Sequence, residues 1–323
     1  MARRIGVVLG GWGEEREVSF KTGEAVVAAL EGRGHTVVRV EAGPGLDGAL
    51  RAARVEVAFL ALHGRLGEDG SVQGLCEVFG IPYTGSGVLA SALAMNKPFA
   101  KQLFTLHNVP CPRGHVICAA DAERAAELHG DLGFPAVVKP ARGGSSVGMS
   151  VVTQEAELVP AVRLAQRFGG EALVERQVRG REVTVGILGH RVLGSCEIVH
   201  PAAAFDYQHK YQGGSRSFVP ARLSEARRAN IEALALRAYR ALGCRGYGRV
   251  DFICGETDND VVLEVNTLPG LTPVSLLPKI GAHAGLAFAD LTVAILEQAS
   301  LDSTEARDAE LAAGSPRPLL ATG

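Results

Sequence analysis

One face of a predicted hairpin carries side chains that suit a metal ion. Two β-rich runs near the end of the chain, separated by a short turn, predict two antiparallel strands. In such a pair the residue numbers of any two facing residues add up to the same value. Arg249 then pairs with Asn266 and Asp251 with Glu264, so all four side chains share one face. Opposed like charges are destabilising without a compensating cation, and two carboxylates with an amide oxygen suit Mg2+. The alternative is a solvated strand face balanced by Arg249 alone.

A glycine- and serine-rich loop follows a lysine between two predicted strands. The segment from Lys139 to Gly148 contains successive small residues, whose backbone N–H groups can approach a phosphate closely. Because the lysine precedes the glycines and no helix follows them, the loop matches neither a Walker A loop nor a dinucleotide fingerprint. The layout predicts a mobile flap over nucleotide phosphates, and a plain flexible hairpin is the alternative. Lysine is rare in this chain, with six lysines against 27 arginines, and a compact ammonium suits a phosphate oxygen.

Acidic and histidine residues follow two predicted strands in the first third of the chain. Glu15, with Glu14 and Glu17 beside it, comes after the first strand, and His63 ends another. Both lie at the carboxyl edge of the predicted sheet, where open α/β sheets bind ligands. The alternatives are acidic residues that favour a helix N-terminus and a structural histidine.

The elements that must position these residues begin with a predicted doubly wound unit. Short apolar runs at residues 5–9, 36–40 and 55–62 are bounded by turn residues, and a helical stretch covers 19–31. This alternation is typical of a parallel sheet with crossover helices. We therefore expect an N-terminal α/β domain, a doubly wound parallel sheet, over residues 1–95.

The rest of the chain predicts α+β structure in two parts, residues 96–179 and 180–302. A long polar loop at 200–220 suits a functional lid, and residues 303–323 predict a disordered tail. Glu175 and Glu182 flank a short turn, which fits either a hinge or a solvated turn. The expected strands are 114–118, 135–139, 147–152, 172–177, 182–188, 191–199, 248–254 and 260–266, and the expected helices are 97–107, 121–130 with Asp121 as its N-cap, 154–168, 224–242 with Ser224 as its N-cap, and 286–299.

Composition limits the classes of function. The 323 residues, 47% hydrophobic and 21% charged, are ordinary for a globular chain of two domains. A net charge of -2 provides no positive field for a nucleic acid or a membrane surface, and no apolar run is long enough to span a bilayer. The six cysteines have no paired spacing and are expected to be reduced thiols of a cytoplasmic protein. We expect neither a nucleic-acid partner nor a membrane partner.

Seven motifs occur in a fixed order along nearly the whole chain. They are EREVS at 15–19, LHG at 62–64 with GEDG at 67–70, PYTGSG at 82–87, GSSVGMS at 144–150, KY at 210–211, GRVD at 248–251 and EVNTLPG at 264–270. By these motifs the chain resembles the D-alanine–D-alanine ligases of the ATP-grasp superfamily. Two positions depart from the family pattern: Asn96 stands where an aspartate is usual, and Gln177-Val178 replaces a bulkier pair.

The resemblance implies a fold and a reaction. Residues 1–95 would be a substrate-binding domain, followed by a two-part ATP-grasp domain whose parts carry the flap and the lid. ATP would phosphorylate a first D-alanine, and the amine of a second would attack the acylphosphate to give D-alanyl-D-alanine for peptidoglycan synthesis. The implied cofactors are ATP and two Mg2+ ions, for which Mn2+ can substitute. The implied partners are the small-molecule substrates and a second copy of the chain, in a homodimer.

The resemblance also implies a role for each matching residue. Phosphate would be bound by Lys97, Lys139 and Lys210, adenine and ribose by Glu175 and Glu182, and the two metal ions by Asp251, Glu264 and Asn266. The oxyanion would be stabilised by Arg249 and the Gly270 N–H, and the second carboxylate would be bound by Ser275 and the Leu276 backbone. The first D-alanine would be held by Glu15 and His63, while Ser145 and Tyr211 would hydrogen-bond with Glu15 and keep the lid closed.

Two other functions fit parts of this pattern. Another ATP-grasp carboxylate–amine ligase would differ in the amino acid that triggers ADP formation. A nucleotide-binding regulatory protein without turnover would have no need of the face from Arg249 to Asn266.

Overall fold

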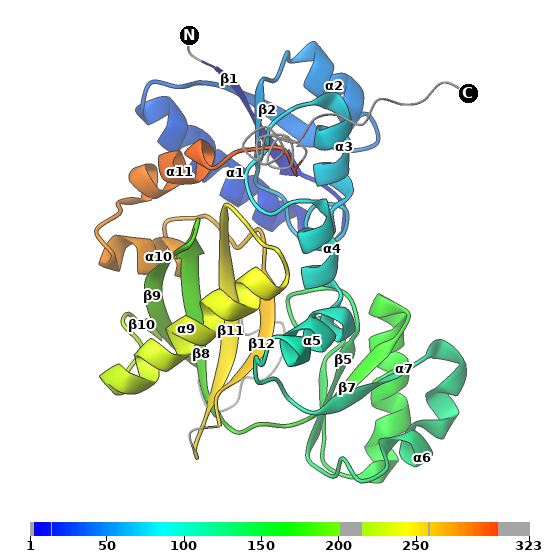
Figure 1. Ribbon diagram of the computed structural model, residues 1–323. Helices are drawn as coiled ribbons and strands as arrows, with labels where there is room; N and C mark the ends of the chain where they lie inside the picture. Colours follow the sequence, from blue (N-terminus) through cyan, green and yellow to red (C-terminus); the bar gives the residue numbers. More distant parts are fainter. Residues whose placement is uncertain (1–2, 14, 201–214, 258, 303–323) are drawn as a thin grey trace, which may run out of the picture.

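A three-stranded parallel sheet occupies the first third of the chain (Figure 1). The computed structural model describes residues 3–13, 15–200, 215–257 and 259–302, and it orders these strands β2-β1-β3. Central strand β1 is buried along almost its whole length, as expected for a parallel strand covered on both faces. The α/β prediction is confirmed here. The elements are β1 (Arg4–Gly10), α1 (Arg16–Gly32), β2 (Thr36–Ala42), α2 (Leu46–Ala52), β3 (Val57–Leu60), α3 (Ser71–Phe79) and α4 (Val88–Met95).

The next part is a four-stranded antiparallel sheet in the order β4-β7-β5-β6. Strands β5 and β6 pair on either side of the glycine-rich loop, which confirms the predicted hairpin. Helix α7 packs against β5 and β7. The elements are α5 (Lys97–Leu106), β4 (Gly114–Ile117), α6 (Ala125–His129), β5 (Ala136–Pro140), β6 (Ser150–Val152), α7 (Leu158–Gly169) and β7 (Ala172–Arg176).

A five-stranded antiparallel sheet, β10-β9-β8-β11-β12, forms the third part. Helix α9 packs on one face, and α10 packs on the other, where Gly186 leaves room because a Cβ would lie 2.8 Å from Leu277. The Ser224 hydroxyl accepts a hydrogen bond from the Arg227 N–H, so the predicted N-cap is confirmed. The elements are β8 (Gly180–Leu188), β9 (Arg191–Val199), β10 (Arg216–Phe218), α9 (Glu225–Ala241), β11 (Tyr247–Gly255), β12 (Val261–Asn266), α10 (Leu276–His283) and α11 (Phe288–Glu297).

The register of the final hairpin agrees with the prediction at the positions that matter. Arg249 pairs with Asn266 and Asp251 with Glu264. Directly after Asp251 the register shifts by one residue at a β-bulge, so the constant sum ends there. A bulge bends its strand and is common beside functional sites.

Three expectations were wrong in detail. The predicted helix 121–130 begins as a 3-10 turn (Ala119–Arg124), because Asp121 pairs with Arg124 inside that turn instead of capping a helix. The end of the predicted loop 200–220 forms strand β10, which pairs with the edge of β9. Helix α10 was not expected. Residues 201–214 of the predicted lid and the predicted tail 303–323 lie outside the described residues, and the three domain ranges stay a prediction.

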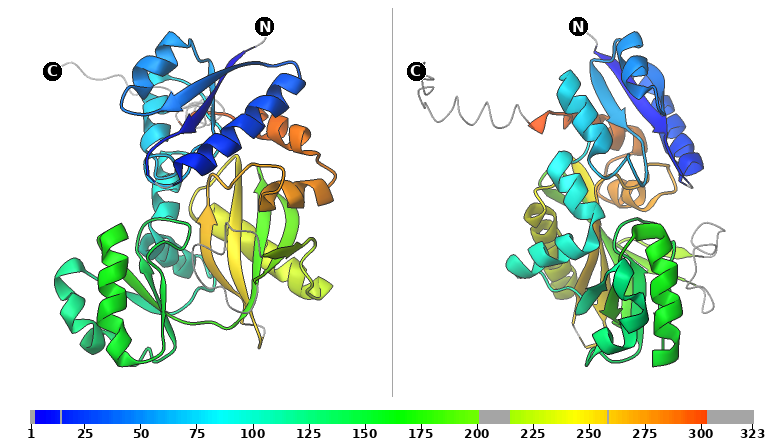
Figure 2. Two further views of the ribbon diagram at one scale, coloured as in Figure 1. Left: turned by 180° about the vertical axis from the view of Figure 1, so that it is seen from behind. Right: turned by 90° about the vertical axis from the view of Figure 1, so that its right-hand side faces the viewer.

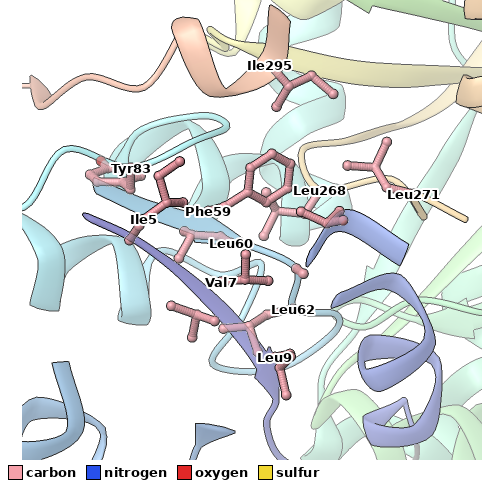
Figure 3. Packing of buried hydrophobic residues seen from close by; sticks show 14 of the residues in the cluster. Ile5, Val7, Leu9, Phe59, Leu60, Leu62, Tyr83, Leu268, Leu271 and Ile295 are labelled. Carbon is pink, nitrogen blue, oxygen red and sulfur yellow. The ribbon is translucent and has the colours of Figure 1, made fainter. Parts of the chain in front are cut away.

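The end of the described chain packs against its beginning (Figure 2). Figure 3 shows Leu268, Leu271 and Ile295 packed with β1 and β3 residues such as Phe59 in one buried cluster. Residues from both ends of the sequence therefore build the first hydrophobic core. Among the described residues no single helix has the length and apolar composition to cross a membrane, and the pair α10 and α11, which has them jointly, is bent by 101°.

Candidate active site

A cavity of about 200 Å³ lies between the four-stranded and five-stranded sheets. The glycine-rich loop, β5 and β7 form one side, and β8, β11 and β12 form the other. Six predicted site residues line it: Lys97, Lys139, Glu175, Glu182, Asp251 and Glu264. Gln177 and Val178, the positions that depart from the family pattern, line it too. Folding thus brings the lysines of the second part of the chain and the carboxylates of the third part into one space.

Helix α5 starts at the cavity and connects its two sides. Asn96 is the N-cap, and its side-chain oxygen accepts a hydrogen bond of 3.3 Å from the Phe99 N–H. The Lys97 ammonium lies 3.1 Å from a carboxylate oxygen of Glu264 and donates to the Gly143 carbonyl at 2.5 Å. One lysine therefore contacts both the metal-type face and the glycine-rich loop.

A buried carboxylate joins two further lysines. Glu175 is 2% exposed, and its oxygens form ion pairs with Lys139, at 2.6 Å, and with Lys101. Burial alone would raise the pKa of Glu175, but the attraction of Lys139 and Lys101 outweighs it and lowers that pKa. Sequence reasoning missed Lys101. Its only signal was its position one helical turn after Lys97 in a chain with few lysines.

The carboxylate of Asp251 is fully engaged by neighbouring donors. The Arg249 guanidinium donates to both of its oxygens, at 2.8 and 2.7 Å, the Thr184 hydroxyl donates at 2.6 Å and the Asn266 amide at 2.9 Å. Although burial opposes its charge, the Asp251 carboxylate raises the pKa of Arg249 above its ordinary value. Arg249 is therefore a fixed positive charge on this face.

The donor set of this face fits Mg2+. Asp251 and Glu264 stand opposite one another on β11 and β12, and Asn266 adds an amide. Among the described residues no group of three or more His, Cys, Asp or Glu side chains is arranged to hold a metal by itself. Mg2+ commonly takes one or two carboxylates and completes its shell with water and substrate phosphates. These residues suit an ion that arrives with a phosphorylated ligand.

The glycine-rich loop reaches the N-terminal part of the chain. The Ser145 hydroxyl donates a 2.5 Å hydrogen bond to Glu15, the residue that precedes α1. Ser145 and Ser146 have φ of 54° and 59°, a backbone conformation uncommon for residues other than glycine. Glu15 makes no side-chain cap to its own helix. Its carboxylate thus serves the contact with the loop rather than the helix N-terminus.

The turn after β3 lies against the same carboxylate. Gly64 has a φ of +67°, and a Cβ there would overlap the Glu15 carboxylate. Burial lowers the pKa of neighbouring His63 to about 4, and its Nε2 lies 3.1 Å from the Thr22 hydroxyl. Burial raises the pKa of Glu68 to about 8, and this side chain accepts a hydrogen bond from the Gly64 N–H at 2.6 Å. Glu68 belongs to the GEDG motif at 67–70, and no role for it was predicted from the sequence.

The N-terminus of α10 provides a separate set of donors. Ser275 occupies the N-cap position and Leu276 the first helical position. The Ser275 hydroxyl accepts from the Thr272 N–H at 3.1 Å, and Gly270 lies beside it. The unpaired N–H groups of a helix N-terminus attract anions. These residues, like Glu15, His63, Arg249 and Asn266, do not line the cavity between the sheets.

Two predicted residues, Lys210 and Tyr211, lie outside the described residues. Next to that segment, His200 bridges Glu182, at 2.8 Å from its carboxylate, and the Ser215 hydroxyl, at 2.9 Å. Glu182 is therefore already engaged at the edge of the cavity.

Comparisons with known proteins agree on one family. A family model described as D-ala D-ala ligase C-terminus matches residues 113–297, and one described as D-ala D-ala ligase N-terminus matches residues 40–86. A D-alanine–D-alanine ligase of Geotalea uraniireducens is 47% identical over 300 residues, which cover 93% of this chain and 96% of the relative.

Solved structures are similar over the same range. The D-alanine–D-alanine ligase of Bacillus anthracis complexed with ATP has a TM-score of 0.83 and 33% identity, covering 96% of this chain and 100% of the other. The VanG D-Ala:D-Ser ligase of Enterococcus faecalis has a TM-score of 0.81 and 29% identity, covering 92% and 99%. From its sequence, its fold and its site residues, this chain belongs to the D-alanine–D-alanine ligase family.

Proposed function

We propose that this chain uses ATP to join two D-alanine molecules into D-alanyl-D-alanine, a peptidoglycan precursor, with release of ADP and phosphate. The observation that carries the proposal is that Lys97, Lys139, Asp251 and Glu264 line one cavity, with Arg249 on the same strand face. Phosphate-binding cations and metal-binding carboxylates in one cavity suit phosphoryl transfer, in which catalysis is mostly positioning and charge stabilisation.

The proposed reaction has two steps. A carboxylate oxygen of the first D-alanine attacks the γ-phosphorus of ATP and ADP leaves, which gives an acylphosphate. The amine nitrogen of the second D-alanine attacks the acyl carbon, loses a proton, and phosphate leaves. Lys97, Lys139 and the N–H groups of the glycine-rich loop bind the phosphates, while Glu175 and Glu182 lie toward adenine and ribose. Lys210 would be a third phosphate ligand.

The amino acids would bind beside the cavity, next to the N-terminal part of the chain. Glu15 pairs with the ammonium of the first D-alanine, and His63, held neutral by burial, contributes a hydrogen bond rather than a charge. Arg249 and the Gly270 N–H stabilise the oxyanion of the tetrahedral intermediate. Ser275 and the Leu276 N–H bind the carboxylate of the second D-alanine. Tyr211 would join Ser145 and Glu15 when the lid closes.

Two Mg2+ ions, for which Mn2+ can substitute, would be held by Asp251, Glu264 and Asn266. Bound Mg2+ would supply positive charge that neutralises the transferred phosphoryl group. The support is chemical: both carboxylates contact cationic side chains, Arg249 and Lys97, which are the groups proposed for the oxyanion and the phosphates. A phosphorylated ligand with a bound metal ion would offer the metal to the two carboxylates and its phosphates to the cationic side chains at the same time.

We also propose a homodimer that works in the cytoplasm, where ATP is available. Sedimentation of the full chain at micromolar concentration tests the oligomeric state, and a single monomeric species would contradict it.

The function is tested by ADP release in a coupled assay with Mg2+ and one amino acid or hydroxy acid at a time. D-Alanine should give ADP and an equal amount of D-alanyl-D-alanine, measured by chromatography. L-Alanine alone should give neither. ADP release triggered only by another amino acid would instead indicate a different carboxylate–amine ligase, and ATP binding without any turnover would indicate a regulatory protein.

A second assay tests the choice of the second substrate by supplying D-alanine together with D-serine or D-lactate. Because a structurally similar protein is named a D-Ala:D-Ser ligase, the mixed products must be quantified. We expect D-alanyl-D-alanine to dominate. A mixed dipeptide in excess at equal concentrations would contradict this assignment of the second substrate.

A further inference from the structure

Lys101 makes an ion pair that the proposed reaction has not used. It lies on α5, one turn after Lys97, and its side chain is about as buried as that of Lys97. Lys97 and Glu175 line the cavity between the sheets, whereas Lys101 does not; it lines a separate groove. Any effect of Lys101 on the nucleotide must therefore pass through another residue.

That residue is Glu175. Its carboxylate pairs with Lys101 on one side and with Lys139 on the other, and Lys139 lines the cavity. The three side chains form a row, Lys101–Glu175–Lys139, with a net charge of +1. All three are nearly buried, so water screens their mutual interactions weakly.

The charge balance of this row determines how much net positive charge Lys139 presents to a phosphate in the cavity. With Lys101 present, the negative charge of Glu175 is shared between two ammonium groups, and one net positive charge remains at the cavity. Without Lys101, Glu175 and Lys139 would be a closed pair with no net charge. An isolated buried pair holds its partners strongly, so Lys139 would be retained by Glu175.

Three buried charged side chains lower the stability of the fold, so we expect this row to have a role in binding. Burying charged groups costs free energy that packing with apolar side chains would avoid, and a buried ion pair is weak evidence of a stabilising role. The start of α5 is also fixed, because the Lys97 N–H donates to the carbonyl of Ala141, the residue directly after β5. The helix therefore holds Lys101 at a set position beside β7.

We propose that Lys101 is a positioning residue for ATP: it neutralises the second oxygen of Glu175, so that Lys139 keeps its charge for the nucleotide phosphates. This inference rests on the proposed function for the identity of the nucleotide. It assigns Lys101 no contact with ATP, and it assigns Glu175 the task of holding Lys139.

The test is ATP affinity, measured by calorimetry with a non-hydrolysable ATP analogue and Mg2+. Lys101→Met should raise the dissociation constant by about 10-fold or more, the effect of one charge acting across a partly buried site. In steady-state assays KM for ATP should rise similarly, while kcat at saturating ATP and KM for D-alanine stay within about 2-fold of the original values. Lys21→Met, the same change at an exposed position of α1, is the matched control and should alter none of these.

A double variant separates positioning from a purely structural role. Because Glu175 also lies toward adenine, Glu175→Gln serves as the reference background. There the pair between Glu175 and Lys139 is already lost, so adding Lys101→Met should change ATP affinity by less than about 2-fold. A purely structural role predicts a further loss as large as that of Lys101→Met alone. Unchanged ATP affinity in folded Lys101→Met, or a full further loss in the double variant, would overturn the proposal.

A third variant keeps the test decisive if Lys101→Met does not fold. Lys101→Arg keeps the positive charge beside Glu175 and should bind the analogue within about 2-fold of the original chain, and a loss of about 10-fold would contradict a role for the charge of Lys101. Analogue binding does not depend on turnover. If the original chain binds the analogue but releases no ADP with D-alanine, the proposed function fails while the test of Lys101 stands.

Discussion

At the scale of single residues, the site is organised by charges that are already paired. Asp251 is satisfied by Arg249, Thr184 and Asn266, and Glu264 contacts Lys97. Such pairing keeps a dense set of charges stable without a ligand, because each buried charge needs a partner. A nucleotide, with the metal ion proposed to accompany it, would therefore exchange partners with these side chains rather than fill empty positions.

Glu264→Gln tests the metal face. The substitution removes one of two facing carboxylates, so turnover should fall by on the order of 10²-fold or more through weaker charge stabilisation. The fold should survive, because a repulsion with Asp251 is removed as well. Glu256→Gln, at an exposed position of the same hairpin, is the control. Turnover of Glu264→Gln close to that of the control at moderate Mg2+ would contradict the assignment.

His63 predicts a loss of stability in acid. Burial holds its pKa at about 4 in the folded chain, against about 6.5 in an unfolded one. Between pH 6.5 and pH 4 His63 is protonated in the unfolded chain but stays neutral in the folded chain. Stability that is present above pH 6.5 is therefore lost as the pH falls toward 4. The loss attributable to His63 should be roughly 3 kcal/mol.

The measurement is the free energy of unfolding in denaturant at pH 7 and pH 5. His63→Gln should show a smaller decrease between these values than the original chain, whereas exposed His107→Gln should show the same decrease. Parallel pH profiles for all three proteins would mean that His63 titrates normally.

At the scale of elements, helix α5 links the sheets on either side of the cavity. Its first residue contacts the glycine-rich loop and β12, and Lys101, a turn later, contacts β7. The direction of one short helix therefore determines the positions of two cationic side chains, Lys97 and Lys101. Its N-cap, Asn96, fixes where the helix begins.

Asn96→Ala should lower stability by about 1 kcal/mol, because the Phe99 N–H loses its acceptor. It should also raise KM for ATP, since the lysines of α5 depend on the start of the helix. Ser224→Ala removes the corresponding cap of α9, away from the cavity, and should cost similar stability with no change in KM. If both variants changed KM equally, the effect would come from general destabilisation. Thermal unfolding and steady-state kinetics provide the two measurements.

At the scale of the whole molecule, the chain is closed by contacts between its ends. Tyr83 and Ser300 exchange backbone hydrogen bonds, and the Asp302 carboxylate accepts from the Val88 N–H at 3.0 Å and from Arg245 at 3.1 Å. Asp302 thus caps α4 from the far end of the sequence. Helix α4 leads directly into Asn96 and α5, so this contact supports the site from a distance.

Asp302→Ala should destabilise the fold by roughly 1–3 kcal/mol, because the Val88 N–H and Arg245 lose a charged acceptor. Activity at 25 °C should be nearly unchanged, since no ligand is expected at that position. Asp131→Ala, an exposed aspartate, is the matched control. A thermal midpoint equal to that of the control would show that Asp302 contributes little.

The amino-acid sequence by itself determined the features that depend on local pattern. Period-2 alternation and a short turn placed Arg249, Asp251, Glu264 and Asn266 on one face, and the register agrees. The N-cap of α9 and the hairpin around the glycine-rich loop were predictable for the same reason, because neighbours in the chain decide them. Ordered motifs identified the family, which the comparisons confirm.

Only the tertiary structure decided which distant residues meet and how deeply they are buried. The row Lys101–Glu175–Lys139 needs α5, β7 and β5 to converge, and no periodicity in any one segment encodes that. The raised pKa of Glu68 and the lowered pKa of His63 likewise follow from burial, which depends on everything packed around a residue. Local sequence fixes the direction of a side chain, whereas its partner and its solvation are set by long-range packing.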